Sequence, residues 1–200
     1  MYPGTVAPML IVAYNYNDYG FKETKIEMYS HTGTHIDAPA HLFAGGITLD
    51  KFPIDRFVGK ALVIDCRKLK KEENISMALL EEKGNALYET EFILFLTGHS
   101  ALWGTPGYFD NFPVMSPEVV EWINRRKIKG IGIDAPSFDP VTVDDELNNH
   151  KAILKTNNTI LLENLCNLEE IGTGLFTLVA LPLYTQDADG APARIIAILS

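Results

Sequence analysis

Residues 31–41 read His-Thr-Gly-Thr-His-Ile-Asp-Ala-Pro-Ala-His, and this short segment holds three of the five histidines in the 200-residue chain. A helix is not predicted here, because Gly33 and Pro39 interrupt the segment and three of its other residues are β-branched. In an extended chain, alternate residues share one face. The segment therefore predicts polar side chains that converge on one side of a strand.

The histidines and the aspartate of this segment predict a metal site. His31, His35 and Asp37 have the same parity, and Gly33 between them leaves space for an ion or a substrate. Imidazole nitrogen and carboxylate oxygen suit Zn²⁺, Mn²⁺ or Fe²⁺. His41 follows a proline beyond the extended part, so we expect it at the rim, as an acid–base catalyst and not as a ligand. The alternative for each histidine alone is an ordinary hydrogen bond, and the clustering of three favours the metal.

Composition and charge indicate a soluble globular protein. Apolar residues make up 46% and charged residues 22% of the chain. The net charge of −9 disfavours nucleic acid and anionic membranes as partners, because both attract basic surfaces. No apolar run is as long as a membrane span and no signal peptide is visible, so a cytoplasmic location is expected. Cys66 and Cys166 adjoin apolar runs, and two buried, reduced thiols are expected in preference to a disulfide.

Strand-like and helix-like patterns alternate along the chain. Strands are expected at residues 24–30, 61–66, 92–97, 131–134, 159–163, 175–183 and 193–199. Helices are expected from Ser76 to Gly84, from Ser116 with an end by Gly130, and at residues 150–155. This alternation predicts one α/β domain over residues 1–200, with a buried mixed sheet as its core.

The rest of the chain offers few further ligands. His99 and His150 are the other two histidines. Glu163 ends an apolar strand, where burial is costly unless the carboxylate is paired or bound to a metal. Judged alone, Glu163 is equally a surface residue at a strand end, and its own pattern does not link it to the metal.

The motif His-x-Gly-Thr-His-x-Asp-Ala-Pro-x-His resembles the signature of the cyclase-like metal-dependent hydrolases, a family that includes bacterial kynurenine formamidases and isatin hydrolases. The resemblance extends over nearly the whole chain. Further segments similar to the family are residues 57–66, 97–100, 103–108, 132–140 and 189–194. The first motif is specific, and the other segments support a full-length relationship.

The resemblance implies a fold, an assembly and a ligand set. The fold would be a mixed, barrel-like β-sheet flanked by helices, of the swivelling β/β/α type, in a homodimer or homotetramer. One or two Zn²⁺ ions are expected, with Mn²⁺ as the alternative. His31 and His35 would bind the first ion, Asp37 would bridge, and His150 and Glu163 would bind the second. His41 matches the catalytic histidine of the family.

Two features of the chain depart from the family pattern. The family has a strand and a loop before the segment that resembles residues 2–5, so a difference is expected at an oligomer contact or at one wall of the pocket. The position of His99 is often tryptophan in the family, and a structural role is expected here in preference to pocket lining. Seven aromatic residues are expected either near the site, where they could hold an aryl group, or in the core: Tyr14, Tyr16, Tyr19, Phe43, Trp103, Tyr108 and Phe138.

Hydrolysis of a C–N amide bond in a formamide or cyclic amide fits these residues, and the family resemblance implies N-formylkynurenine as the first candidate substrate. A bound metal ion supplies an acidified water and polarises a carbonyl group. No Gly-x-Ser-x-Gly motif supports a serine nucleophile. The alternatives are a metal-dependent cyclase or lyase that stabilises an enolate, and a metal-binding module without catalysis. Release of a carboxylate such as formate separates hydrolysis from cyclisation or dehydration.

Overall fold

The computed structural model describes residues 4–70, 73–142, 146–156 and 158–199. Its centre is an eight-stranded mixed sheet with the strand order β10-β8-β4-β5-β6-β7-β3-β9. The strands are β3 (His35–Asp37), β4 (Val58–Asp65), β5 (Phe92–Leu96), β6 (Gly130–Ile133), β7 (Ile160–Glu163), β8 (Phe176–Val179), β9 (Gly190–Pro192) and β10 (Ile196–Ile198). Strands β4, β5, β6 and β7 run parallel, and the flanking strands pair antiparallel. The predicted α/β class with a mixed, barrel-like sheet is confirmed.

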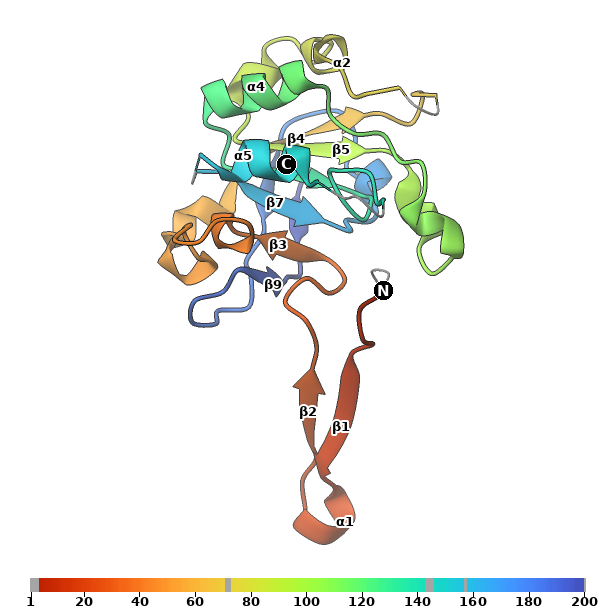
Figure 1. Ribbon diagram of the computed structural model, residues 1–200, viewed down its shortest axis with the longest axis vertical. Helices are drawn as coiled ribbons and strands as arrows, with labels where there is room; N and C mark the ends of the chain where they lie inside the picture. Colours follow the sequence, from red (N-terminus) through yellow and green to blue (C-terminus); the bar gives the residue numbers. More distant parts are fainter. Residues whose placement is uncertain (1–3, 71–72, 143–145, 157, 200) are drawn as a thin grey trace.

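Helices cover one face of this sheet (Figure 1). They are α2 (Met77–Glu81), α3 (Ala86–Glu89), α4 (Pro117–Arg126) and α5 (Asn148–Leu154). Short 3₁₀ helices lie in the connections: η1 (Pro39–His41), η2 (Leu49–Lys51), η3 (Ile54–Phe57), η4 (His99–Leu102), η5 (Pro106–Phe109) and η6 (Leu168–Glu170). The helix expected from residue 76 to residue 84 is therefore shorter, and α5 begins two residues earlier than expected.

The central strands are apolar on both faces because both faces are buried. In β5, Ile93 and Phe95 pack in the cluster beneath the helices, whereas Leu94 and Leu96 pack in a second cluster on the other face. The second cluster includes Ile36 of β3. A continuous apolar run is the pattern expected for a strand covered on both sides, which is why this strand could be predicted.

Helix α4 starts where the sequence predicts and ends before Gly130, as expected. Ser116 accepts a hydrogen bond from the backbone N–H of Val119, as an N-cap does. The helix ends at Arg126, and its C-cap residue Lys127 has the left-handed conformation. Gly130 begins β6, where a Cβ atom would lie 2.7 Å from the ring of Phe92. This glycine therefore serves close packing of the sheet and not the termination of a helix.

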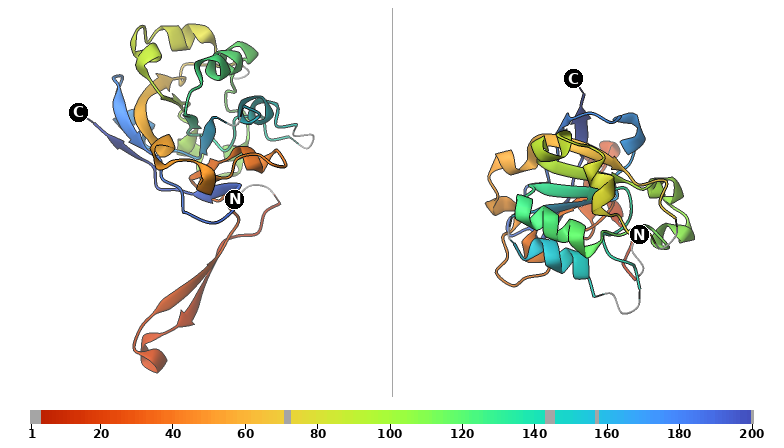
Figure 2. Two further views of the ribbon diagram at one scale, coloured as in Figure 1. Left: turned by 90° about the vertical axis from the view of Figure 1, so that its left-hand side faces the viewer. Right: turned by 90° about the horizontal axis from the view of Figure 1, so that it is seen from above.

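A two-stranded arm projects from the body (Figures 1 and 2). It consists of β1 (Met9–Tyr14), α1 (Tyr16–Tyr19) and β2 (Glu23–Glu27), and β1 pairs with β2 alone. Every residue of these three elements is exposed. The sequence predicted β2 but not β1. The placement of Tyr14, Tyr16 and Tyr19 near the metal site is wrong, because all three lie on the arm.

The two cysteines differ in exposure. Cys66 is buried and Cys166 is exposed, so the prediction of two buried thiols is wrong for Cys166. Both are free thiols, as expected. Among the described residues, no helix has the length and apolar character needed to cross a membrane.

Candidate metal centre

Strand β3 is the base of the site. It lies between β7 and β9, and His35 is paired with Glu163 on one side and with Pro192 on the other. His35 and Asp37 lie on the same face of β3, as the alternation predicts. The expected continuous strand back to residue 31 is wrong, because Gly33 has a φ of +67° and turns the chain. The turn nevertheless brings the ring of His31 back to Asp37.

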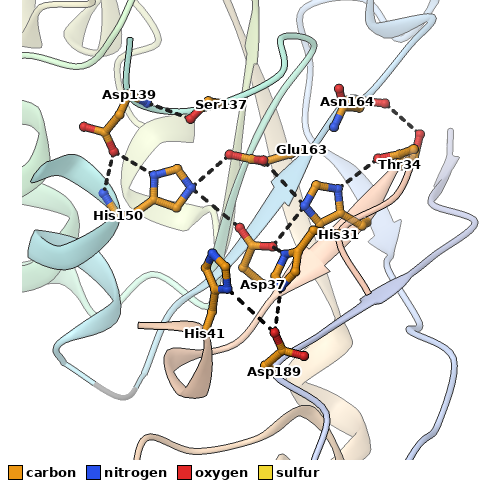
Figure 3. Close-up of polar contacts among 12 residues, drawn as sticks. His31, Thr34, Asp37, His41, Ser137, Asp139, His150, Glu163, Asn164 and Asp189 are labelled. Atoms are coloured by element: carbon orange, nitrogen blue, oxygen red, sulfur yellow. Dashed lines mark hydrogen bonds and ion pairs between the residues drawn. The ribbon is translucent and has the colours of Figure 1, made fainter. Parts of the chain in front are cut away.

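Asp37 lies at the centre of the cluster (Figure 3). Its Oδ1 atom lies 2.6 Å from His31 Nδ1 and 3.1 Å from His35 Nε2, and its Oδ2 atom lies 3.6 Å from His150 Nε2. The side chain is 1% exposed. Burial alone would raise the pKa of Asp37, but the charge of His35 and the hydrogen bonds of His150 and His31 hold that pKa well below its usual range. Three histidines from two distant segments therefore converge on one buried carboxylate.

His150 is held between two acids. Its Nε2 atom lies 3.0 Å from Glu163 Oε1, and its Nδ1 atom lies 2.7 Å from Asp139 Oδ2. Asp139 also accepts hydrogen bonds from the backbone N–H groups of Asn149 and His150 in the first turn of α5. Burial alone would lower the pKa of His150, whereas its contacts with Asp139, Asp37 and Glu163 raise that pKa well above 6.5. Asp139 thus fixes both the ring and the start of its helix.

The donor set of this cluster fits a divalent metal ion. One group of possible ligand atoms comes from His31, His35 and Asp37, and a second comes from Asp37, His150 and Glu163, with the atoms of each group within 4.8 Å of one another. Burial lowers the pKa of His35, but the charge and hydrogen bond of Asp37, together with the charge of Glu163, raise that pKa to about 9. A cation can replace such protons on buried histidines beside carboxylates. The nitrogen and oxygen donors suit Zn²⁺ or Mn²⁺.

His41 lies at the rim. It ends η1, and its ring centroid lies 4.0 Å from that of His31. Burial, followed by the charge of His31, lowers the pKa of His41, which favours the neutral ring that a general base needs. His41 belongs to neither of the two ligand groups around Asp37. It forms a third group with His31 and Asp189.

Asp139 and Asp189 were not identified as site residues from the sequence. Both lie in segments that resemble the family, residues 132–140 and 189–194, and this is the only signal that pointed to them. Neither residue has a local pattern of its own. The structure brings Asp189 to 2.9 Å from His31 Nε2 through Oδ2.

The cluster opens into a cavity of about 640 Å³. Its walls contain the metal-ligand candidates, His41 and Asp189, together with Thr5, Pro8, Tyr29, Ser30, Thr32, Gly33, Trp103, Tyr108, Phe109, Pro136, Ser137, Leu147 and Asn164. Trp103 and Tyr108 therefore line the pocket, which agrees with the interpretation that placed aromatic residues near the site and not in the core. Phe43 and Phe138 pack in the core instead.

His99 has the structural role that the sequence favoured. It is buried, and its Nε2 atom lies 2.6 Å from the backbone oxygen of Tyr108. The ring of Trp103 packs edge-to-face on Tyr108 with a centroid distance of 5.1 Å. His99 thus supports the aromatic wall from behind without lining the cavity.

The mixed sheet carries a buried histidine–carboxylate cluster that could hold a metal ion and that opens into a pocket. A family model described as "Putative cyclase" matches residues 4–140. The chain belongs to this Cyclase family, and it is a metal-dependent amide hydrolase.

Curated relatives and solved structures agree with this assignment. The chain is 33% identical over 177 residues to the kynurenine formamidase of Bordetella petrii and 34% identical over 173 residues to that of Bacillus anthracis. Each match covers 86% of this chain and 78% of the relative. Isatin hydrolase A from Labrenzia aggregata, bound to benzyl benzoate, superimposes with a TM-score of 0.81 at 24% identity, over 96% of this chain and 82% of that chain. A "predicted metal-dependent hydrolase" from Bacillus stearothermophilus gives a TM-score of 0.68 at 27% identity, over 95% and 86% of the two chains.

Proposed function

We propose that the protein hydrolyses an aryl formamide, with N-formylkynurenine as the first candidate substrate and a cyclic aryl amide as the second. The observation that carries the proposal is the buried cluster around Asp37, which opens into a cavity with an aromatic wall. Trp103 and Tyr108 offer ring faces and edges to an aryl group. The names of the kynurenine formamidase and isatin hydrolase relatives support the same substrate class.

The proposed ligand set follows the two groups of donor atoms. His31 and His35 would hold one ion, His150 and Glu163 would hold the other, and Asp37 would contact both. Zn²⁺ is the proposed metal, because it binds nitrogen and oxygen donors more tightly than Mn²⁺ does. Mn²⁺ is the alternative. The expected content is one to two ions per chain.

The site residues have separate roles in the proposed reaction. When bound, the metal supplies a Lewis acid that polarises the substrate carbonyl and acidifies water. His41 Nδ1 faces Asp189, so Nε2 is the atom proposed to take a proton from the attacking water and to return it to the leaving nitrogen. Asp139 holds the ring of His150 through Nδ1. One water is consumed, the C–N bond breaks, and formate and an aryl amine are released.

The test is turnover by metal-reconstituted protein. The protein is stripped of metal, loaded with Zn²⁺ or Mn²⁺, and given N-formylkynurenine, a simple formanilide and isatin. Formate release from the first two, or ring opening of isatin, supports amide hydrolysis. Product without a released or newly formed carboxylate would favour the cyclase or lyase alternative. Tight metal binding without turnover on the whole panel would favour a metal-binding module, and failure to bind any divalent metal would end the central hypothesis.

The arm supports the further proposal that the protein is a homo-oligomer. Nine large apolar side chains on the arm are exposed: Met9, Leu10, Ile11, Val12, Tyr14, Tyr16, Tyr19, Phe21 and Ile26. A two-stranded hairpin is marginal in water by itself. At roughly half exposure, the four aromatic side chains alone offer about 400 Å², which is half of the roughly 800 Å² that each partner buries in a stable complex, and the five aliphatic side chains add to this area. A second copy of the chain is the proposed cover.

Sedimentation of the wild type and of one double variant tests this proposal. Leu10→Glu with Val12→Glu places two charges on one face of β1 and is expected to yield a monomer. Ile54→Glu, on an exposed residue of the body, is the matched control and is expected to leave the assembly intact. A wild type that sediments as a monomer at micromolar concentration would contradict the proposal.

A further inference from the structure

We propose that Asp189 is a positioning residue that holds His31 and His41 with one carboxylate oxygen, and this proposal rests on the proposed function. Asp189 Oδ2 lies 2.9 Å from His31 Nε2 and 3.7 Å from His41 Nδ1. Ser30 donates a hydrogen bond from Oγ to the same oxygen at 3.4 Å. The proposed ligand and the proposed base therefore share one acceptor (Figure 3).

The fold fixes the place of this carboxylate. Asp189 directly precedes β9, and its backbone oxygen accepts a hydrogen bond from the N–H of Ala38 at 2.8 Å. The next residue, Gly190, is paired with Asp37 of β3. A Cβ atom on Gly190 would lie 2.5 Å from His31 Cε1, so the ring of His31 rests directly on this backbone. Strand pairing thus places Asp189 beside the ring of His31, although the two residues are 158 positions apart in sequence.

The contact determines which nitrogen of His31 is left for a metal. An imidazole that gives one nitrogen to a metal keeps one N–H, and a carboxylate is a common acceptor for it. Asp189 takes the Nε2 side of the ring. The Nδ1 side faces Asp37, the centre of both ligand groups. Asp189 therefore orients His31 toward the proposed ions without belonging to the buried donor set.

The same carboxylate acts on His41. Among the residues that the structure describes, no side-chain hydrogen bond holds the His41 ring. Its ring lies against the ring of His31 with a tilt of 39°, and Asp189 Oδ2 lies 3.7 Å from its Nδ1 atom. Loss of the carboxylate would remove one contact from each ring at once, while Asp37 would still contact His31. A purely structural role would have a different signature, because the Asp189 side chain is 47% exposed and its removal leaves no core cavity.

Two substitutions at residue 189 test the proposal against a matched control. Asp189→Asn removes the charge with little change of shape, and Asp189→Glu keeps the charge. Asp187→Asn removes one charge from the same loop two residues earlier, at an exposed position with a φ of +53° that asparagine tolerates. The measurements are Zn²⁺ affinity by chelator competition, Zn²⁺ stoichiometry at saturation, kcat and KM on N-formylkynurenine with saturating Zn²⁺, and the thermal midpoint.

Asp189→Asn is expected to lower Zn²⁺ affinity and kcat by about tenfold to a hundredfold each, the usual effect of losing the partner of a metal-bound histidine. Stoichiometry, KM and the thermal midpoint should stay near wild type. Asp189→Glu should lose less than Asp189→Asn, and Asp187→Asn should lose nothing. This pattern supports a positioning role, because a structural role would lower the midpoint and a substrate-binding role would raise KM.

Other patterns would overturn it. Loss of Zn²⁺ stoichiometry at saturation would make Asp189 a metal ligand. Unchanged affinity and kcat would make it an ordinary surface residue, and an equal loss in Asp187→Asn would assign the effect to loop charge. A wild type without formamide turnover would refute the proposed function alone, since the Zn²⁺ affinities still test the position of Asp189.

Discussion

Gly190→Ala tests the most tightly packed contact of the site. A Cβ atom at this position would lie 2.5 Å from His31 Cε1, 2.8 Å from Nε2 and 3.0 Å from Nδ1. Non-bonded atoms of this kind pack at about 3.5–4.0 Å, so the ring of His31 must retreat by about 1 Å. The backbone itself tolerates alanine, because Gly190 lies in a strand and is not among the glycines with positive φ.

The displacement of the His31 ring should lower the catalytic rate more than it lowers the free energy of unfolding. His31 is 22% exposed at its side chain and can move toward the cavity, so the unfolding free energy should fall by about 1 kcal/mol, the low end for overpacking. That loss lowers the thermal midpoint by about 2–4 °C in a chain of this size. A shift of 1 Å breaks the 2.6 Å contact with Asp37 and the 2.9 Å contact with Asp189. Displacement on this scale costs about a hundredfold in rate.

The assay compares kcat/KM on the formamide substrate, Zn²⁺ affinity and thermal unfolding. Gly174→Ala is the control, because a Cβ atom there meets no atom within 4 Å. Addition of Gly190→Ala to a His31→Ala background should have little further effect if the clash acts through that ring. Wild-type turnover and Zn²⁺ affinity in a folded Gly190→Ala protein would refute the reasoning.

Further predictions address the other site residues and the thiols. His41→Ala should lower kcat by about a hundredfold to ten-thousandfold with metal content near wild type; loss of metal would make His41 a ligand. Asp37→Ala should lower the occupancy of both ions and His150→Ala mainly that of one, as measured by elemental analysis, and full retention in Asp37→Ala would rule out a bridge. A thiol reagent at pH 8 should modify one thiol in the native protein and two in denaturant. The reason is that burial raises the pKa of Cys66 to about 12, which keeps it protonated, whereas Cys166 is exposed; rapid modification of both native thiols would contradict this burial.

The parts of the fold that could be predicted are those with a local physical signal. Strands β4, β5 and β7 are apolar runs because they are buried on both faces. Strand β9 has three residues and includes Gly190 and Pro192, so neither length nor alternation identifies it. No strand was predicted at residues 9–14, and an apolar run such as Met9–Val12 usually indicates burial, whereas here every residue is exposed, so an arm could not be predicted.

The residues of the candidate site likewise differ in whether a local sequence signal predicts them. His31, His35 and Asp37 lie within seven residues, so their types and spacing alone indicated a metal. Glu163 gave an ambiguous signal, because its burial depends on a pairing with β3 that is 128 positions away in sequence. Asp139 and Asp189 gave no local signal, and only the family resemblance of their segments pointed to them, since an aspartate in a loop is ordinary until a histidine is placed against it.

The register of β3 explains why residue types could be predicted and their partners could not. A slip by one residue would turn His35 and Asp37 to the opposite face of the sheet, yet β3 has only three residues. It is held by pairing with β7 and β9 and, at its ends, by hydrogen bonds from Ala38 N–H to Asp189 O and from Ala193 N–H to Thr34 O. These contacts come from distant segments. The same pairing that fixes the register of the metal ligands therefore also places Asp189 beside His31. The spacing of residues 31–41 predicts neither this register nor this contact.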